Sequence, residues 1–283
     1  MSVNMDLRNI TGLEEPLKIL VQSLCDACSS VLKPVISRWQ ARCECEVNEM
    51  HDNMALISSM KKACEEEIVN SIHTVRDERE VRNIINVYSM AIKEMQQLLR
   101  ENPSLKTVDI DPDWASEFYD HAKRCSREEM QVLWAKILVN QCRGERYFKR
   151  TLWTLRNLEP EEAECLVELA PFLIDKYFCP QFVYYKPLIR YNKIQALVDC
   201  GCLNSQECII TIKSGEAVSI SGYRMVFDDS VKTIDFSGLS LTDVGGQLLG
   251  LIQDVKPDEQ FTNEIRHHLE THFNGNAWLV EAV

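Results

Sequence analysis

The 283-residue sequence contains few of the turn-forming residues, Gly and Pro, that β-rich folds need. It has 10 Gly and 9 Pro, and neither residue occurs between Ser37 and Leu99. Because a sandwich or barrel needs a turn roughly every ten residues, this scarcity favours long helices. The hydrophobic fraction of 45% and charged fraction of 26% are those of an ordinary folded protein and exclude a disordered chain.

Long hydrophobic runs are also missing. No stretch reaches the roughly 18 uncharged apolar residues of a membrane helix. The segment Met1–Ile10 carries Asp6 and Arg8 and lacks the basic and then apolar regions of a signal peptide. We therefore expect a cytoplasmic protein with no integral membrane segment, in which most of the 12 Cys are buried, reduced thiols.

Motifs for catalysis are absent from the sequence. It contains no serine in a Gly-rich elbow, no phosphate-binding loop and no dinucleotide fingerprint. The sequence therefore favours a non-enzymatic role and implies no cofactor.

A Glu/His cluster and several Cys clusters contain residue types that bind metals, but their spacing does not match that of known metal sites. Glu264, His268 and His272 recur at four-residue steps on one face of an expected helix, but Leu269 follows His268 where zinc helices usually carry glutamate. The cysteine clusters lie in expected helix or near a single turn: Cys25, Cys28, Cys43 and Cys45, then Cys200, Cys202 and Cys208. We predict no metal site and keep Glu264, His268 and His272 as the candidate ligands.

Charge is distributed unevenly along the chain. Residues 159–283 carry 9 basic and 19 acidic residues, a net charge of −10 that repels polyanions. The segment from Arg143 to Arg156, in contrast, contains five basic residues and only one acidic residue, Glu145. Aromatic residues are interleaved with the basic ones. Such a segment can bind a phosphate backbone and stack bases, or it can bury its aromatics and leave its arginines solvated. The candidate binding residues are Arg143, Arg146, Lys149, Arg150 and Trp153.

The first hundred residues predict a helical arm or hairpin. Leu13–Val35 has the apolar period of an amphipathic helix. Ser37–Leu99 predicts one very long helix or two, with a turn or kink near Thr74–Glu80. The later part carries an apolar seam at 4-3-4-3 spacing, which faces a single partner helix. From this seam we predict a homo-oligomer joined through Ile84, Tyr88, Ala91, Met95 and Leu98.

The remaining chain predicts a helical middle domain and a mixed tail. Asp113 is the expected N-cap of one helix, and Ser126 begins a capping box for the next. After Pro180 come a helix, strands near 209–212, 218–227 and 231–236, two helices and a last edge strand. The fold class is therefore mainly α, with a C-terminal α+β module of winged-helix-like pattern. We predict three domains, at residues 1–102, 103–180 and 181–283.

The middle domain carries a tryptophan motif, which comprises Trp114–Phe118, Cys125–Leu138, Arg150-Thr151-Leu152 and the Leu-rich helix after Pro160. This motif resembles a bacterial family, the domain of unknown function 2806. Trp134 lies on the apolar stripe of its helix, so we expect it to be buried against Trp114 and Phe118. Further similarity lies at Gly12-Leu13 with Pro16-Leu17, Arg82-Asn83-Ile84, Leu197–Leu203, Leu241-Thr242 and Gly245.

After Leu138 the chain departs from the family pattern, with Val139-Asn140-Gln141-Cys142 in place of a small residue, Gly and Glu. The resemblance implies a cytoplasmic bacterial protein with no known catalytic residue, in a phage-defence or mobile-element context.

Three functional hypotheses follow from these features. The first is a non-enzymatic interaction and oligomerisation protein with a protein partner. The second is a nucleic-acid-binding protein that uses residues 143–156. The third is a toxic effector that acts on membranes through Leu13–Val35, although Glu14 and Glu15 oppose binding to anionic lipid.

Overall fold

The computed structural model of the chain describes residues 14–26, 35, 38–39, 53–71, 74–185, 188–213, 215–220, 223–227, 233–252, 255–256, 258–273 and 277–282. By its internal contacts the chain forms two compact units, unit 1 (residues 1–156) and unit 2 (residues 157–283). This division differs from the three predicted ranges, because the long helix of the arm packs on the helices of the middle segment.

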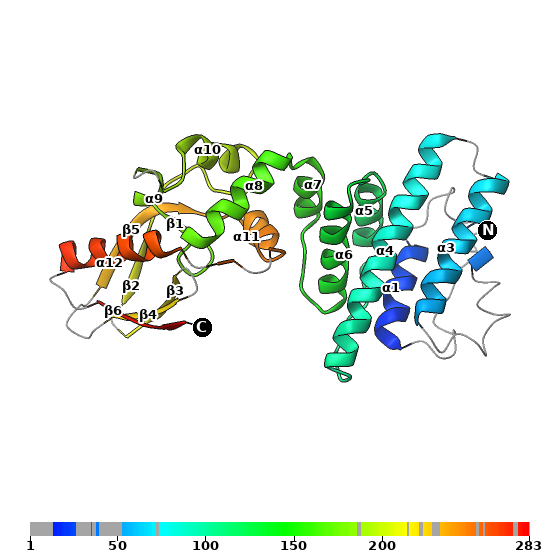
Figure 1. Cartoon of the computed structure of the whole chain (residues 1–283), viewed down its shortest axis with the longest axis horizontal. Helices are drawn as coiled ribbons and strands as arrows, with labels where there is room; N and C mark the ends of the chain where they lie inside the picture. The colour runs from blue at the N-terminus through cyan, green and yellow to red at the C-terminus, as the bar shows by residue number, and fades with distance from the viewer. Residues whose placement is uncertain are drawn as a thin grey trace. The chain divides into compact units, whose positions relative to one another are not determined.

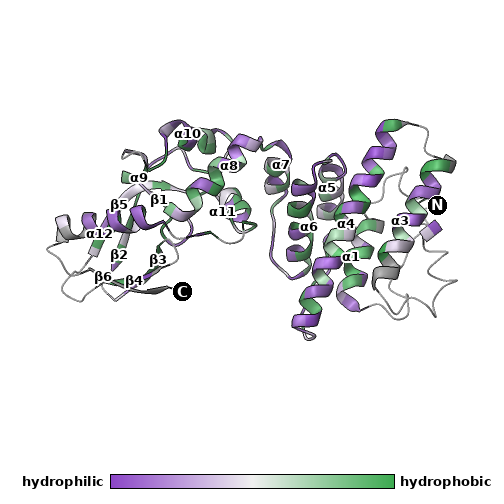
Figure 2. Cartoon of the chain, in the orientation of Figure 1, coloured by the Kyte–Doolittle hydropathy of each residue, from purple (hydrophilic) through white to green (hydrophobic). Residues whose placement is uncertain are grey.

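Unit 1 is helical wherever its described residues form regular structure. The helices are α1 (Glu15–Asp26), α3 (Asn53–Ser71), α4 (Val75–Glu101), α5 (Pro112–Ala122), α6 (Glu128–Cys142) and α7 (Lys149–Asn157). The helix α4 is central, and α1, α3, α5 and α6 all pack against it (Figure 1). Both hydrophobic and hydrophilic residues occur on these helices (Figure 2), as expected for helices that bury only part of their surface.

The predicted helical arm contains two separate helices, α3 and α4, and not one very long helix. This agrees with the second of the two predicted alternatives. Thr74 is the N-cap of α4, and its hydroxyl accepts a hydrogen bond from the Asp77 backbone N–H at 3.1 Å. The helix α1 is described only to Asp26, and the predicted continuation over residues 27–34 lies outside the described residues.

Two predicted helix caps were wrong. The N-cap of α5 is Asp111, whose carboxylate accepts from the Trp114 backbone N–H at 2.9 Å, because Pro112 occupies the first turn. The N-cap of α6 is Arg127, which makes no side-chain cap, and the Ser126 hydroxyl instead accepts a hydrogen bond from Asn83.

Unit 2 combines helices with two small antiparallel sheets. Its helices are α8 (Pro160–Leu169), η2 (Ala170–Phe172, a 3₁₀ turn), α9 (Phe182–Tyr185), α10 (Tyr191–Asp199), α11 (Asp243–Leu249) and α12 (Glu259–Phe273). Its strands are β1 (Phe178–Pro180), β2 (Cys208–Lys213), β3 (Ala217–Ile220), β4 (Tyr223–Phe227), β5 (Thr233–Ser240) and β6 (Ala277–Ala282). The sheet orders are β1-β5-β2 and β3-β4-β6.

The predicted fold class, mainly α with a C-terminal α+β module, is confirmed. The predicted edge strand exists as β6, which pairs with β4. The single strand expected over 218–227 is instead the antiparallel pair β3 and β4, and β1 was not predicted. The winged-helix-like pattern stays a prediction at the level of element order.

Each unit has its own core. In unit 1 fully buried side chains from α1, α4, α5 and α6 meet, including Leu20, Tyr88, Phe118 and Trp134. In unit 2 Phe261 of α12 lies 5.5 Å from Phe172 and 5.8 Å from Phe182, measured between ring centroids. Pro160 occupies the first turn of α8, and Thr242 caps α11, both as predicted.

Candidate nucleic-acid interface

The segment that joins α6 to α7 is anchored by Tyr147, which is 5% exposed. Its backbone N–H donates to Gln141 Oε1 at 2.9 Å, and its carbonyl accepts from Trp114 Nε1 at 2.8 Å. Its hydroxyl accepts from Asn140 Nδ2 at 3.2 Å. Gly144 ends α6 with φ +90°, a conformation that glycine adopts without steric cost. The loop around Tyr147 is therefore held in one conformation.

The helix α7 has one buried and one exposed face. The buried face consists of Thr151, Leu152, Thr154 and Leu155. Because a helix turns every 3.6 residues, the remaining positions share the exposed face: Lys149, Arg150, Trp153, Arg156 and Asn157. Trp153 is 60% exposed, and the three cationic side chains stand three or four positions from it, as neighbours on a helix surface do.

The ring of Phe148, just before α7, lies near the guanidinium groups of Arg146 and Arg150. The Arg150 guanidinium carbon is 4.7 Å from the centroid of the Phe148 ring, and that of Arg146 is 5.9 Å from it. Both distances fit cation–π contacts. We call the whole set the basic–aromatic surface: Arg146, Phe148, Lys149, Arg150, Trp153 and Arg156.

Arg143, which the sequence placed in the same group, is engaged elsewhere. Its guanidinium lies 3.3 Å from Asn140 Oδ1 and 3.9 Å from the Glu145 carboxylate. Burial raises the pKa of Glu94, and the charges of Lys136 and Arg143 oppose that rise. The charge of Arg143 is therefore shared with acidic neighbours, and we leave Arg143 out of the basic–aromatic surface.

Arg156 has an imidazole beside it. Arg156 Nη1 lies 3.4 Å from Nδ1 of His121, which is 8% exposed and follows Glu117 by one turn of α5. Burial and, secondly, the charge of Arg156 lower the pKa of His121, and Glu117 opposes the shift. His121 is therefore neutral at neutral pH, and Arg156 retains its net positive charge.

The predicted oligomer seam lies inside unit 1. Ile84, Tyr88, Ala91 and Met95 are each 0% exposed, and Leu98 is partly buried. Tyr88 contacts Phe118 edge-on, with 6.2 Å between ring centroids, and its hydroxyl lies 3.2 Å from Ser23 Oγ on α1. The four fully buried side chains are covered by helices of the same chain, so a second copy cannot pack on them in folded unit 1.

The predicted amphipathic helix is likewise part of the core. Four apolar residues of α1 are each 0% exposed in unit 1, namely Leu17, Leu20, Val21 and Leu24, and Ile19 is partly buried. Its apolar face is therefore not available to a bilayer. Within the described residues, no helix combines the length and apolar character needed to cross a membrane.

The tryptophan motif forms a packed aromatic cluster. Trp134 is 1% exposed and meets Phe118 edge-on at 5.4 Å between centroids, and Phe118 stacks on Trp114 at 5.3 Å. The predicted burial of Trp134 is confirmed, and its role is packing.

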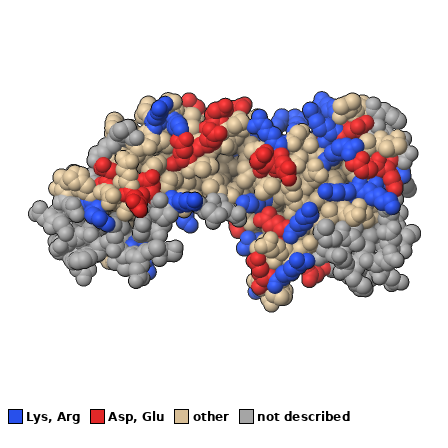
Figure 3. Space-filling model, viewed as in Figure 1, with Lys and Arg blue, Asp and Glu red and all other residues tan. Residues whose placement is uncertain are grey.

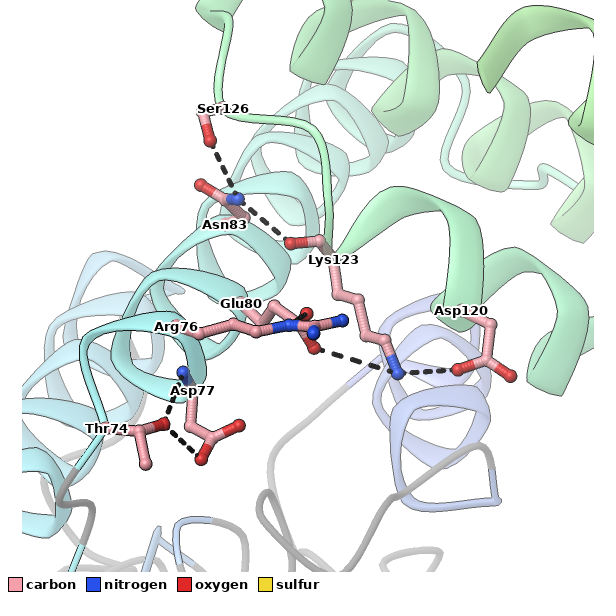
Figure 4. A network of polar contacts seen from close by, with 8 residues as sticks. All are labelled: Thr74, Arg76, Asp77, Glu80, Asn83, Asp120, Lys123 and Ser126. Carbon is pink, nitrogen blue, oxygen red and sulfur yellow. Dashed lines mark hydrogen bonds and ion pairs between the residues drawn. The ribbon is translucent and has the colours of Figure 1, made fainter. Parts of the chain in front are cut away.

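A polar network missed by the sequence reasoning joins α4 to the turn between α5 and α6 (Figure 4). Buried Asn83 donates through Nδ2 to the Lys123 carbonyl at 2.9 Å and to Ser126 Oγ at 3.1 Å. Lys123 Nζ in turn lies 2.6 Å from Asp120 and 3.9 Å from Glu80. The signal in the sequence is an asparagine between Val81 and Ile84 on the buried stripe of a helix.

Among the described residues, neither a metal-ligand cluster nor the cavity beside α1 offers an alternative site. No group of three His, Cys, Asp or Glu side chains there is placed to hold a metal. Glu264 is half-buried in α12, while the side chains of His268 and His272 lie outside the described residues. A polar cavity of about 100 Å³ between α1 and Asp109-Ile110 is smaller than the roughly 300 Å³ of small ligand pockets.

Residues 72–177 match the family described as Protein of unknown function (DUF2806), so the predicted resemblance is confirmed over that range. The matched range includes α4, the tryptophan motif and the basic–aromatic surface. The predicted similarities near residues 12–17 and 197–245 lie outside it. No curated protein and no solved structure matches the chain.

Proposed function

For a chain whose residues 72–177 carry this family domain, we propose a non-enzymatic binding protein that holds single-stranded nucleic acid on the basic–aromatic surface. The observation that carries the proposal is the environment of Trp153. Tryptophan is a largely buried residue type in folded proteins, yet here its ring is 60% exposed on a helix face that also presents Lys149, Arg150 and Arg156.

The chemistry of this surface fits an unpaired strand. Lys149, Arg150 and Arg156 can each neutralise a phosphate, and the Trp153 ring offers a face on which a base can stack. Stacking on a side chain requires a base that is free of its duplex neighbours. A single-stranded segment therefore uses both the charges and the ring, whereas a duplex would use the charges alone.

Electrostatics restrict binding to this part of the protein. Unit 1 carries 22 basic and 24 acidic residues, a net charge of −2, whereas unit 2 carries 9 and 19, a net charge of −10. Figure 3 shows Lys and Arg interspersed with Asp and Glu over unit 1, and acidic side chains gathered over α8. We expect an isolated fragment of residues 180–283 not to bind DNA, because the charges of that segment repel phosphates.

The other functional expectations from the sequence are separate from the proposed binding of nucleic acid. They are a cytoplasmic location, a homo-oligomer, a protein partner and a role in phage defence or a mobile element. Self-association has to use a surface other than the buried seam Ile84–Leu98.

The test is fluorescence anisotropy of the full chain with a labelled single strand of mixed sequence, about a dozen nucleotides long, which spans the site sizes usual for such proteins. We expect binding that weakens with salt, with a log–log slope of about −0.7 per contacted phosphate. Trp153→Ala should weaken binding by about 1–3 kcal/mol. Arg150→Ala should also reduce the magnitude of the salt slope by about 0.7.

Two matched controls separate the surface from general effects. Arg100→Ala removes an exposed charge at the end of α4, and Tyr191→Ala removes a ring that is 62% exposed in unit 2. Neither change should alter binding. Absence of binding at low salt, or an equal loss with Arg100→Ala and Arg150→Ala, would refute the proposal.

A further inference from the structure

Two thiols meet where α10 ends in unit 2. The helix stops at Asp199, Cys200 caps it, and Gly201 turns the chain with φ +79°. The Cys202 backbone N–H then folds back to donate to the Leu197 carbonyl at 2.8 Å. The turn places both cysteines at one carbonyl group, because the Cys200 thiol also lies close to the Leu197 carbonyl.

The two thiols have different environments. Cys202 is 0% exposed, whereas Cys200 is partly exposed, and its thiol also donates to the Leu197 carbonyl at 3.5 Å. The neighbouring Cys202 thiol lowers the pKa of Cys200, while the Cys200 thiol and burial raise the pKa of Cys202. The pair therefore consists of an accessible nucleophile and a buried neighbour.

The backbone around Cys202 is fixed by α11. The Cys202 carbonyl accepts from the Thr242 backbone N–H at 3.0 Å, and the Thr242 hydroxyl donates to the Gly201 carbonyl at 2.6 Å. A Cβ added to Gly245 would lie 2.0 Å from the Cys202 carbonyl oxygen, so α11 packs directly on this residue. No atom lies within 4 Å of a Cβ built on Gly201, which leaves this residue room to adjust.

From this arrangement we propose that Cys200 and Cys202 form a redox-reactive dithiol that a hydroperoxide converts to a disulfide. The accessible sulfur and its buried neighbour are two residues apart on a turn whose middle residue is glycine. A thiol that is both partly exposed and next to a second thiol has the two properties that reversible oxidation requires.

The reaction proceeds in two balanced steps. The Cys200 thiolate attacks one peroxide oxygen, the S–O bond forms as the O–O bond breaks, and hydroxide leaves and takes up the thiol proton as water. Cys202 sulfur then attacks the Cys200 sulfenic acid, the S–S bond forms as the S–O bond breaks, and a second water leaves. The sulfurs lose two electrons, which the peroxide gains. The negative charge of Cys200 is one of the causes that raise the pKa of Cys202. The sulfenic acid is uncharged, so this contribution is lost after the first step.

The experiment uses the full chain treated with equimolar hydrogen peroxide, then alkylated and digested. Cleavage after both Lys193 and Glu207 yields a peptide of residues 194–207, which carries only the proposed pair and excludes Cys179 and Cys208. We expect this peptide to lose two hydrogens and to regain alkylation after reduction. Before oxidation, Cys200 should alkylate about tenfold faster than an ordinary thiol near neutral pH.

Cys125 is the matched control, because it is also partly exposed and its thiol donates to a backbone carbonyl, that of Arg127, as the Cys200 thiol does to Leu197. In Cys202→Ser the sulfenic acid should persist on Cys200 and react with dimedone, and in Cys200→Ser the Cys202 thiol should stay reduced. Retention of both thiols in the wild-type chain while Cys125 oxidises would overturn the proposal, as would a disulfide between other cysteines. The wild-type measurement decides the matter even if a variant fails to fold.

Discussion

Two tryptophans on neighbouring helices of unit 1 have opposite environments. Trp134 on α6 is 1% exposed, whereas Trp153 on α7 is 60% exposed. The helix α6 packs against both α4 and α1, and Ile137, Leu138 and Val139 are all fully buried on it. The helix α7 buries one face only. The same residue type therefore stabilises the fold on α6 and is available to a ligand on α7.

The strongest test of this contrast removes the core on which α6 rests. Ile84→Asp with Met95→Asp places two carboxylates at positions that are 0% exposed. Burying an unpaired charge costs several kcal/mol in real proteins, so we expect unit 1 to unfold. Circular dichroism and limited proteolysis measure this.

The control for the double substitution is Lys93→Asp, an exposed position on the same helix α4, which should leave the protein folded. A folded double variant with an unchanged melting temperature and a lower oligomer state would restore the seam as an intermolecular contact.

A direct comparison of the two tryptophans has the next largest effect. Trp134→Ala should lower the free energy of unfolding by about 3–5 kcal/mol, because it leaves a cavity among buried rings. Trp153→Ala should change it by less than about 0.5 kcal/mol. Urea unfolding followed by circular dichroism compares both variants. Equal losses would mean that Trp153 also serves the core.

The polar network beside Trp134 predicts an intermediate effect. Asn83→Ala leaves the Lys123 carbonyl without the Asn83 donor and removes one partner of Gln131, which lies 3.4 Å from Asn83 Oδ1. Loss of a buried hydrogen-bonding group costs about 1–3 kcal/mol. Ser126→Ala, at an exposed position, should cost less in the same urea experiment. A neutral Asn83→Ala would contradict a role for this side chain in joining α4 to the α5–α6 turn.

The smallest expected effect is a pH dependence from His121, which lies between the two regions. Its pKa is lower than 6.5 in the folded state, so the unfolded chain takes up a proton first as the pH falls below 6.5. Stability should therefore fall between neutral and mildly acidic pH. His121→Asn should reduce this fall, measured as the difference in urea midpoint between the two conditions. An identical pH dependence in the variant would exclude His121 as its source.

The tryptophan cluster and the helical hairpin could be predicted because each follows from apolar residues at helical spacing. The exposed ring of Trp153 could not be predicted. Basic and aromatic residues in alternation are compatible with both a buried and an exposed ring. The missed strand β1 has only three residues, too few to show a period, and its pairing partner β5 lies far along the chain.

The sequence by itself determined which face of each helix is apolar, where the charge is segregated and where Pro160 and Thr242 start helices, because these depend on local spacing and backbone chemistry. Only the tertiary structure decided what covers those faces. The Ile84–Leu98 stripe is covered by helices of its own chain, and no helical period distinguishes that partner from a second copy. Likewise, Asn83 reaches Lys123 and α11 reaches Cys202 only once distant segments pack together.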